Sequence, residues 1–410
     1  MRNLLVTITN APHGYGGVSA WIERITEALP KYGWCVITLT HALDEKHLVD
    51  WRSNHPKMVI KPLYGRFARL SDVDPYLGQY LDEVKPDVVA ISYSFWMIPT
   101  LQERKRRGHP LRVIGCCHQD GDAAYSGLSY YRHCFDHVLC FGSKTYEKLL
   151  AIGYATDEVT LVPHGVPCPE VMPTRTYQGK IRLAYVGRLV QEQKRILDFV
   201  PLVRALNVRG LDYRLDFYGS GPDEDELRKR IRAVDEGKVV FHGWLPAERV
   251  ASIAWPQADI CVHLSEYEVG GAPLSVLEAM AYGAVPIVTR ISGIEHTVRT
   301  GETGYTFEVG DIERCADLIV SLDRDRDKLA AMSQRAWALI QQEHSIQAHA
   351  YRLAEVLHTV LERPARLAPA GYMGVTAHPL VRLLPGPAIV YARRMLKRGS
   401  AINEGYTTLP

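Results

Sequence analysis

Short apolar runs alternate with amphipathic stretches along most of the chain. Apolar runs bounded by Gly, Pro or polar residues predict buried strands, and apolar residues three or four apart predict helices. The strands expected first are Asn3–Ile8, Cys35–Thr40, Asp87–Ile91, Arg112–Cys116, His137–Cys140 and Thr160–Pro163. Helices such as Ser19–Leu29 and Lys144–Ile152 lie between them. This alternation predicts an α/β domain with a mostly parallel, doubly wound sheet.

The alternation stops at Pro167–Lys180, a stretch with three prolines and no periodicity that predicts a linker. The pattern then restarts, with strands expected at Arg182–Val186, Arg214–Tyr218, Val239–Phe241, Ile260–His263 and Val285–Thr289. We therefore expect two Rossmann-like, doubly wound α/β domains, residues 1–170 and 171–362, that face a central cleft. Ligands of such sheets bind at the carboxyl ends of the strands.

The C-terminal part of the chain predicts one more helix and a tail. The amphipathic segment His344–Glu362 is either the last helix of the second domain or a return to the first. Residues 363–410 are rich in Pro, Gly and Arg, and Ala388–Arg398 fits a basic amphipathic helix. Packing of this helix on the first domain is favoured over contact with a membrane surface or an acceptor, because its apolar stretch is short and interrupted by proline.

Composition narrows the class of protein. The 410 residues exceed what one hydrophobic core usually supports, which agrees with two domains. A net charge of +2 lacks the basic excess that nucleic-acid binders carry, so no nucleic-acid partner is expected. The eight cysteines form no C-x-x-C pair and predict neither a zinc site nor a disulfide framework.

Cysteine usage and hydropathy also bear on location. The N-terminal sequence MRNLLVTITNAPHG is expected to form a strand rather than a signal peptide. No apolar run reaches the ~18 residues that are needed to cross a bilayer. Cysteines without a disulfide pattern favour a reducing compartment. The sequence thus predicts a cytoplasmic protein, with peripheral contact at the inner membrane face as an open alternative.

The strongest chemical signal is HLSEYEVGGAPLSVLEAMAYG, His263 to Gly283. Its first half is a loop after a strand, and this loop carries Glu266 and Glu268. Gly270 and Gly271 follow, and glycines allow a backbone to approach a ligand closely. We expect this loop to line a binding site.

The second half of the same segment predicts a helix. Pro273 suits the first turn of a helix that runs to about Gly283. Free backbone N–H groups near Leu274 and Ser275 would favour phosphate. Glu278 lies one turn beyond Leu274, where its carboxylate can accept hydrogen bonds from a ribose diol. The structural alternative is a buried helix with a Gly-Pro turn and stray acids, but the segment as a whole favours a functional site.

A second segment, YVGRLVQEQKR, runs from Tyr185 to Arg195. A strand ends at Gly187, and Arg188 and Lys194 follow. Two cations at the carboxyl end of a strand suit a diphosphate, because Arg binds it as a fork and Lys as a point charge. The alternative is the solvated start of a basic helix.

Two weaker segments lie in the first domain. NAPHGYGGVSAW opens a helix after a Gly-rich turn at Gly16 and Gly17, where a donor or acceptor could approach the backbone. VIGCCHQDGD delivers His118 to a strand end, where it could bond a sugar hydroxyl or assist proton transfer. Asp120 and Asp122 follow His118, but no further ligand cluster supports a metal site.

In their order along the chain these segments resemble the family 4 retaining glycosyltransferases of the GT-B fold. The resemblance extends from the N-terminus to about Glu362. It rests on the Gly16–Gly17 turn, His118, SKTYEKLLAIGY with VPHGV, YVGRL followed by Lys194, FYGSGP, the segment ending in LEAMAYG, and SGIEHTV with GETGYTFEVGD. Each motif is weak alone, whereas the ordered set is specific.

The resemblance implies a hexosyltransferase-class enzyme that uses a nucleotide diphosphate-sugar of the UDP or GDP type. The acceptor is a saccharide, a lipid-linked molecule or a small molecule, and the anomeric configuration is retained. Glu278 matches the ribose-binding glutamate of the family's E-x7-E motif, and Arg188 and Lys194 match the cations on the donor diphosphate. Gly16–Gly17 and His118 match positions near the transferred sugar. No metal or other cofactor is implied, because the cations and a helix N-terminus stabilise the leaving group.

The chain departs from the family pattern at two spacings. Counting back from Glu278 places Gly270 where the first motif glutamate belongs, and Glu268 fits only with a two-residue insertion. Glu268 as the sugar-contacting acid is therefore a hypothesis, and Glu266 is its rival. Lys194 also lies one residue further from Arg188 than the commonest spacing. Two other functions stay open: a catalytically silent nucleotide-sugar-binding subunit, and an epimerase or hydrolase on the same fold.

Overall fold

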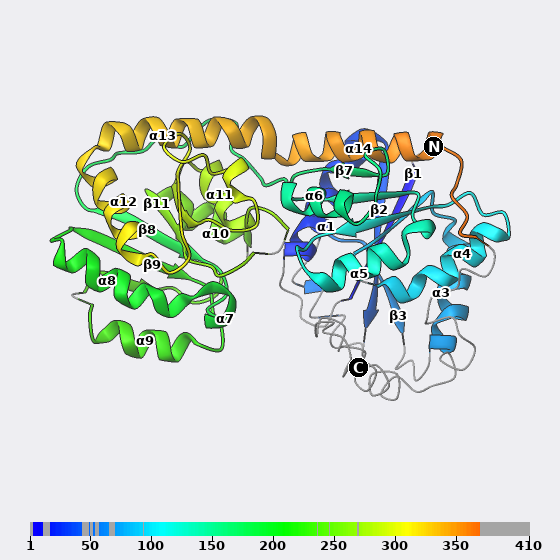
Figure 1. Ribbon diagram of the computed structural model, residues 1–410, viewed down its shortest axis with the longest axis horizontal. Helices are drawn as coiled ribbons and strands as arrows, with labels where there is room; N and C mark the ends of the chain where they lie inside the picture. Colours follow the sequence, from blue (N-terminus) through cyan, green and yellow to red (C-terminus); the bar gives the residue numbers. More distant parts are fainter. Residues whose placement is uncertain are drawn as a thin grey trace. The chain divides into compact units, whose positions relative to one another are not determined.

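The computed structural model describes residues 3–10, 17–42, 49, 52–53, 57–64, 70–92, 94–235, 237–245, 247–268 and 270–369. The chain divides into two compact units (Figure 1). Unit 1 comprises Met1–Val162 with His349–Pro410, and unit 2 comprises Pro163–Ala348. Gly16 and the basic helix expected at Ala388–Arg398 lie outside the described residues.

Unit 1 contains a seven-stranded parallel sheet in the order β3–β2–β1–β4–β5–β6–β7. Its strands are β1 (Asn3–Asn10), β2 (Trp34–Ala42), β3 (Ile60–Tyr64), β4 (Val88–Ile91), β5 (Arg112–Cys117), β6 (His137–Cys140) and β7 (Val159–Leu161). One face packs on α3 (Leu70–Val84), α4 (Ile98–Arg106), α5 (Asp122–Tyr130) and α6 (Ser143–Ala151). The other face packs on α1 (Gly17–Ala28) and α14 (Ile346–Glu362).

Unit 2 contains a six-stranded parallel sheet in the order β10–β9–β8–β11–β12–β13. Its strands are β8 (Ile181–Val186), β9 (Tyr213–Tyr218), β10 (Val239–Phe241), β11 (Ile260–His263), β12 (Val285–Thr289) and β13 (Tyr305–Phe307). One face packs on α8 (Phe199–Val208), α9 (Glu224–Arg232) and α12 (Ile312–Arg324). The other packs on α10 (Ala247–Ile253), α11 (Leu274–Ala281) and α13 (Arg326–Leu339).

Shorter helical turns complete the described elements. Unit 1 has η1 (Leu29–Tyr32), η2 (Phe95–Met97) and η3 (Arg132–Cys134). Unit 2 has α7 (Gln191–Lys194), η4 (Ile196–Asp198), η5 (Trp255–Gln257), η6 (Ile294–His296) and the π-helical turn η7 (Ile340–His344).

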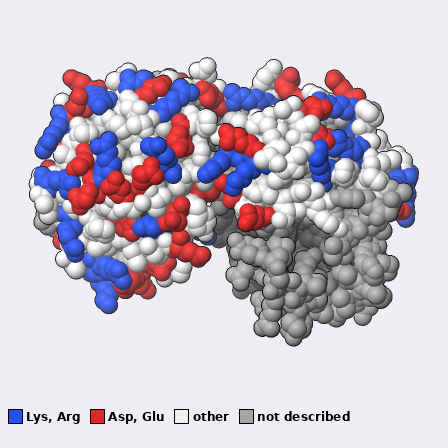
Figure 2. Space-filling model, viewed as in Figure 1, with Lys and Arg blue, Asp and Glu red and all other residues white. Residues whose placement is uncertain are grey.

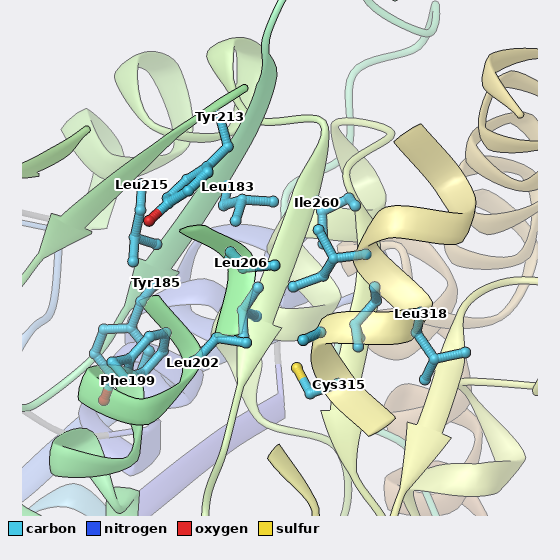
Figure 3. Packing of buried hydrophobic residues seen from close by; sticks show 14 of the residues in the cluster. Leu183, Tyr185, Phe199, Leu202, Leu206, Tyr213, Leu215, Ile260, Cys315 and Leu318 are labelled. Atoms are coloured by element: carbon cyan, nitrogen blue, oxygen red, sulfur yellow. The ribbon is translucent and has the colours of Figure 1, made fainter. Parts of the chain in front are cut away.

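The core of unit 2 is built from large side chains that alternate along its strands. Leu183 and Tyr185 on β8 and Tyr213 and Leu215 on β9 point to the same face and are fully buried there. Figure 3 shows them in one buried cluster that also includes side chains of α8 and Leu318 of α12. Apolar burial of this extent stabilises the sheet and fixes the positions of the loops at its carboxyl edge.

Every strand expected from the sequence is present, and two strands were not expected. β3 contains Lys61 and Pro62 in succession, and Thr306 separates the two aromatic residues of β13, so neither gives a clear apolar run. The helix expected from His344 begins at Ile346 instead. Ser345 is extended, with ψ of 151°, and its Oγ accepts a hydrogen bond from the N–H of Ala348 at 3.3 Å, which starts the helix two residues later.

Within unit 1, the segment after α14 is bonded to the sheet by a carboxylate that also forms a buried ion pair. Asp136 Oδ2 lies 2.5 Å from Lys105 Nζ and accepts from the N–H of Val113 at 2.6 Å. Its Oδ1 accepts from the N–H of Arg366 at 2.5 Å. The side chains of Lys105 and Asp136 are 0% and 5% exposed. One carboxylate therefore joins α4, β5 and the segment that follows α14.

No helix in the described part of the chain is long and apolar enough to cross a membrane. On the face of unit 2 that Figure 2 shows, acidic and basic side chains are interspersed. This mixture agrees with the near-zero net charge and gives no broad patch of one sign on that face.

Candidate active site

The strand order of unit 2 reverses between β8 and β11, which places a topological switch point there. Two loops leave the carboxyl ends of these strands: residues 187–195 after β8 and residues 264–273 after β11. Ligands of open α/β sheets bind at such points, because the loops on either side diverge. The site residues expected in the second domain all lie in these two loops or at the start of α11.

The two loops meet in a buried ion pair between Lys194 and Glu268. Lys194 Nζ donates to Glu268 Oε1, and both residues are 8% exposed. Ser265 Oγ also donates to Glu268 Oε1, at 2.6 Å. The Glu268 backbone is fixed as well, because Ser292 Oγ donates to its carbonyl oxygen at 2.7 Å. The carboxylate is therefore held in one place on the carboxyl edge of the sheet.

Burial and charge oppose each other in this pair. Burial alone would raise the pKa of Glu268, but Lys194, His263 and the hydrogen bonds from Lys194 and Ser265 together lower it below its usual value. Burial lowers the pKa of Lys194, against the opposite effect of Glu268. Glu268 is thus an ionised carboxylate whose charge depends on one cation.

Glu266 is placed differently. Its side chain is 47% exposed, and it accepts from Arg195 Nη1 at 2.5 Å. Its N–H donates to the carbonyl oxygen of Gln193 at 2.9 Å, which joins the two loops through the backbone. Of the two glutamates, the one in contact with Lys194 is Glu268.

Arg188 lies at the outer side of the same loop. Its side chain is exposed, and Nη2 donates to Gln193 Oε1 at 2.6 Å. Its carbonyl oxygen accepts from the hydroxyl of Tyr185 at 2.8 Å, which fixes the turn. An exposed guanidinium near a buried ammonium suits an anion that reaches the loop from solvent.

Gly187 begins this turn in close contact with the turn after β9. A Cβ added at Gly219 would lie 1.9 Å from the carbonyl oxygen of Gly187, so only glycine fits at position 219. The N–H of Gly187 donates to the carbonyl oxygen of Tyr218 at 3.0 Å. The two backbone turns together form the edge of the site.

The loop after β11 reaches α11 through Gly270 and Gly271. These glycines have φ of 80° and 102°, a region that other residues rarely adopt. Within the described residues, α11 begins its backbone bonds at the N–H groups of Val276 and Leu277, which donate to the carbonyl oxygen of Pro273.

The first two turns of α11 carry the remaining expected residues. The N–H groups of Leu274 and Ser275 precede the helical bonds, as the first amides of a helix do. Glu278 lies on the same helix and is 7% exposed. Burial raises the pKa of the Cys261 thiol on β11, and the nearby charge of Glu278 raises it further.

The residues expected in unit 1 do not form a comparable group. Gly17 is the exposed first residue of α1, and Gly16 lies outside the described residues. His118 is 3% exposed. Its ring stacks on Phe141 with centroids 4.3 Å apart, and its Nε2 lies 3.1 Å from Ser92 Oγ.

Burial, with a contribution from His349, lowers the pKa of His118 to about 3, so it is neutral. Its contact with a transferred sugar stays a prediction. Asp120 accepts from Lys148 at 2.6 Å and from Tyr125 at 2.9 Å. Across the described ranges, no three His, Cys, Asp or Glu side chains are arranged to hold a metal ion.

Three residues of the site were not expected from the sequence: Ser265, His263 and Gln193. Ser265 and His263 lie three and five residues before Glu268, at the end of β11. Polar residues at the carboxyl end of a buried strand were the available signal. Their mutual contacts follow from the path of the loop, which spacing alone does not define.

Comparison with known proteins identifies the family to which the chain belongs. The profile described as "Glycosyl transferases group 1" matches residues 180–325, and the profile described as "Glycosyltransferase Family 4" matches residues 15–169. Together the matches cover more than half of the chain and follow the two units. The chain belongs to the group 1 and family 4 glycosyltransferases. The site at β8 and β11 lies inside the group 1 match.

Curated relatives of this glycosyltransferase family cover part of the chain. The N-acetyl-alpha-D-glucosaminyl L-malate synthase of Bacillus anthracis is 34% identical over 144 residues, which are 35% of this chain and 36% of that protein. The sulfoquinovosyl transferase SQD2 of Arabidopsis thaliana is 27% identical over 218 residues, 50% of this chain and 41% of that protein. The chain spans less than half of the length of either relative.

Solved structures of the GT-B type share the whole fold. The structure of Anabaena Alr3699/HepE in complex with UDP and glucose has a TM-score of 0.69 and 14% identity. It covers 87% of this chain and 100% of that protein. The fold is therefore GT-B, with two Rossmann-like units of parallel strands, as the sequence predicted.

Proposed function

We propose that this chain transfers a sugar from a nucleotide diphosphate-sugar to an acceptor hydroxyl, with retention of configuration and without a metal. The observation that supports this most is the Lys194–Glu268 pair at the switch point of unit 2, with Arg188 in the same loop. A buried carboxylate beside a cation suits a site that holds a sugar and a phosphate next to each other.

Arg188 and Lys194 are the proposed ligands of the donor diphosphate. Departure of a nucleoside diphosphate leaves negative charge on a phosphate oxygen, and fixed cations stabilise that charge as it develops. The first amides of α11, at Leu274 and Ser275, add N–H donors and the positive end of the helix dipole. These groups supply the charge that a divalent ion would otherwise supply.

Glu268 and Glu278 are assigned to different parts of the donor. Both bonds that the described residues make to the Glu268 carboxylate end on Oε1, so Oε2 is left for a sugar hydroxyl. Glu278, one turn into α11, is assigned to the ribose hydroxyls. The turns at Gly187 and Gly270–Gly271 carry no side chain, which would allow the backbone to approach the donor.

The proposed reaction exchanges one bond at the anomeric carbon. The bond from C1 to the diphosphate oxygen breaks, and the electron pair leaves with the nucleoside diphosphate. The acceptor oxygen bonds to C1 from the same face, and its proton passes to a departing phosphate oxygen. The donor base is of the UDP or GDP type; UDP is favoured because the Anabaena HepE structure holds UDP and glucose. Location in the cytoplasm, with or without contact at a membrane surface, is part of the same proposal.

Replacing Glu278 with alanine is expected to weaken donor binding by about 10- to 100-fold, because a buried diol would lose a charged acceptor. Calorimetric titration with UDP-sugars and GDP-sugars measures this. Glu313→Ala is the matched control, because Glu313 is 74% exposed on α12 and pairs only with Arg209 in the described structure. Equal donor affinity in wild type and Glu278→Ala would remove the ribose assignment.

Glu268→Gln is expected to lower turnover by roughly 100-fold or more while donor affinity changes little, because the charge near the reacting carbon is lost. Glu266→Gln should change turnover by no more than a few-fold, since an exposed ion pair contributes little. Initial rates of nucleotide release measure both variants. A larger loss in Glu266→Gln than in Glu268→Gln would show that the glutamates are assigned in the wrong order. A protein that binds donor but releases no nucleotide would be the silent subunit.

A further inference from the structure

The Lys194–Glu268 pair is connected to a buried histidine that the proposed reaction does not use. Ser265 Oγ lies 2.6 Å from Glu268 Oε1 and 2.9 Å from His263 Nδ1. His263 and Ser265 are 2% and 0% exposed. His263 ends β11, and its Nδ1 lies 3.7 Å from Glu268 Oε1, so the three side chains form a compact group between the sheet and the site.

The single hydroxyl proton of Ser265 determines the direction of the two hydrogen bonds in this group. Glu268 is ionised beside Lys194 and can only accept, so the Ser265 proton lies on the bond to Glu268. Ser265 Oγ must then accept from the ring of His263, which places the ring proton on Nδ1. Burial, followed by the effect of Lys194, lowers the pKa of His263 to about 4, so the ring is neutral. Donation therefore runs from His263 to Ser265 to Glu268.

His263 makes no other hydrogen bond within the described structure. Its Nε2 is buried and has no partner among the described residues. A leucine would fill an apolar position without leaving a polar atom unsatisfied. The one bond that this histidine makes therefore points to a role in the site rather than in the core.

We propose that His263 is a positioning residue, which as the Nδ1–H tautomer holds the Ser265 hydroxyl on Glu268 Oε1 and so keeps this carboxylate ionised with Oε2 directed to the donor sugar. This inference rests on the proposed function of Glu268. It assigns to the transferase a relay of two residues, His263 and Ser265, that touch no substrate.

The titratable groups around His263, Ser265 and Glu268 bear on how the pH dependence of activity should change when His263 is replaced. The titratable groups that face this relay are Lys194 of α7, Arg188 after β8 and Tyr185 of β8. Burial raises the pKa of Tyr185 well above its usual value, so that phenol is neutral. On the β12 side, Thr289 and Ser292 contribute only hydroxyls.

The hydrogen bond from Ser265 is one of the effects that lower the pKa of Glu268, and neutral His263 supports it by holding the Ser265 proton on that bond. Removal of His263 is therefore expected to raise the pKa of Glu268, so that activity on the acid side is lost at a higher pH. A change in the acid limb of the profile of kcat against pH is expected only if His263 acts through Glu268.

Two substitutions at His263 distinguish loss of the Nδ1–H hydrogen-bond donor from loss of the imidazole ring. His263→Leu removes the Nδ1–H donor, and kcat is expected to fall about 10-fold or more, with a smaller change in donor KM. Its acid limb should move to higher pH, and its unfolding temperature should stay equal or rise. His263→Asn places an amide N–H near the position of Nδ1 and should recover most of the lost kcat.

His137→Leu is the matched control. His137 is also buried, burial lowers its pKa to about 4, and its Nε2 lies 2.8 Å from the hydroxyl of Thr160, with no catalytic carboxylate beyond. This variant should keep the wild-type kcat and acid limb. Wild-type kinetics in His263→Leu, or equal losses in His263→Leu and His263→Asn, would overturn the proposal.

A second measurement does not depend on activity. Long-range nitrogen–proton NMR of ¹⁵N-histidine-labelled protein distinguishes the two ring tautomers, and the resonance lost in His263→Leu assigns the residue. We expect the Nδ1–H tautomer at neutral pH and a changed Nδ1 shift in Ser265→Ala. An Nε2–H tautomer would overturn the relay even in an active enzyme. Absence of nucleotide release by wild type, with the expected tautomer, would instead count against the proposed function.

Discussion

Replacing Lys194 with alanine is expected to reduce sugar transfer by roughly 10²- to 10³-fold, because removal of a preorganised charge partner at a reacting centre has effects of this size. The variant loses the cation proposed for the leaving diphosphate. It also leaves the Glu268 carboxylate buried without the ammonium that keeps it ionised. Initial rates of nucleotide release, compared with donor affinity from calorimetry, measure this loss. The rate should fall more than the affinity.

The variant needs a control for the loss of a surface charge. Lys180→Ala suits this purpose, because Lys180 is 61% exposed and its distance to Asp212 is 3.9 Å. Lys180→Ala should retain the wild-type rate. Lys194→Arg should recover only part of the activity, since a planar guanidinium does not reproduce the point charge of an ammonium. A Lys194→Ala enzyme within a few-fold of wild type, with wild-type folding, would contradict the leaving-group assignment.

Replacing Asp136 with alanine is expected to destabilise unit 1 by about 3–5 kcal/mol, the range measured when one partner of a buried ion pair is removed. Lys105 would then be buried without a counter-ion, because its side chain is fully shielded from solvent. The N–H groups of Val113 and Arg366 would lose their acceptor at the same time. Both effects act on unit 1 alone.

Unfolding must be followed in unit 1 rather than in the whole chain, because two units need not unfold together. Hydrogen exchange of the amides of β5 and β6 reports the stability of this sheet directly. Asp317→Ala is the control: Asp317 is 57% exposed and pairs with Arg209, so a loss of less than about 1 kcal/mol is expected. Protection factors in Asp136→Ala equal to those of wild type would show that this ion pair does not stabilise the sheet of unit 1.

The fold was largely predictable, because its strands are buried on both faces and give continuous apolar runs. β8 and β11 are of this kind, and both appear where the sequence predicted them. β3 was not predicted because Lys61 and Pro62 in succession interrupt its apolar run, and β13 because Thr306 separates its two aromatic residues. The equally short edge strand β10 was predicted, because its three residues are all apolar. Hydrophobic pattern thus identifies a strand when its apolar run is continuous, and it fails where polar residues or proline break a short run.

The site was predictable in outline but not in its contacts. Sequence spacing left Glu266 and Glu268 as alternatives, because the loop is longer than the family pattern. In the structure, Gly270 and Gly271 adopt positive φ between Glu268 and Pro273, in the stretch that holds the additional residues. Glu268 can then meet Lys194 while Glu266 meets Arg195. Contacts of this kind depend on the path of the backbone, which spacing does not specify.

His118 lies in different surroundings from the polar residues of unit 2. Its position at a strand end suggested contact with a sugar hydroxyl, which stays a prediction, and in the structure its ring lies in a buried aromatic group with Phe141 and Trp21. A strand-end histidine can point into the core or to the edge of the sheet, and the sequence does not distinguish these directions.

The central claim is that unit 2 binds a nucleotide diphosphate-sugar and cleaves its bond to the sugar. Phosphorus and proton NMR of UDP-sugars and GDP-sugars, each incubated with wild type and with Lys194→Ala, tests this directly. We predict that wild type slowly releases nucleoside diphosphate from one donor and that the first sugar product has the same anomeric configuration as that donor. Release should be at least about 10-fold slower in the variant. Intact donors in every wild-type sample, from a protein that is folded and binds none of them by calorimetry, would contradict the account.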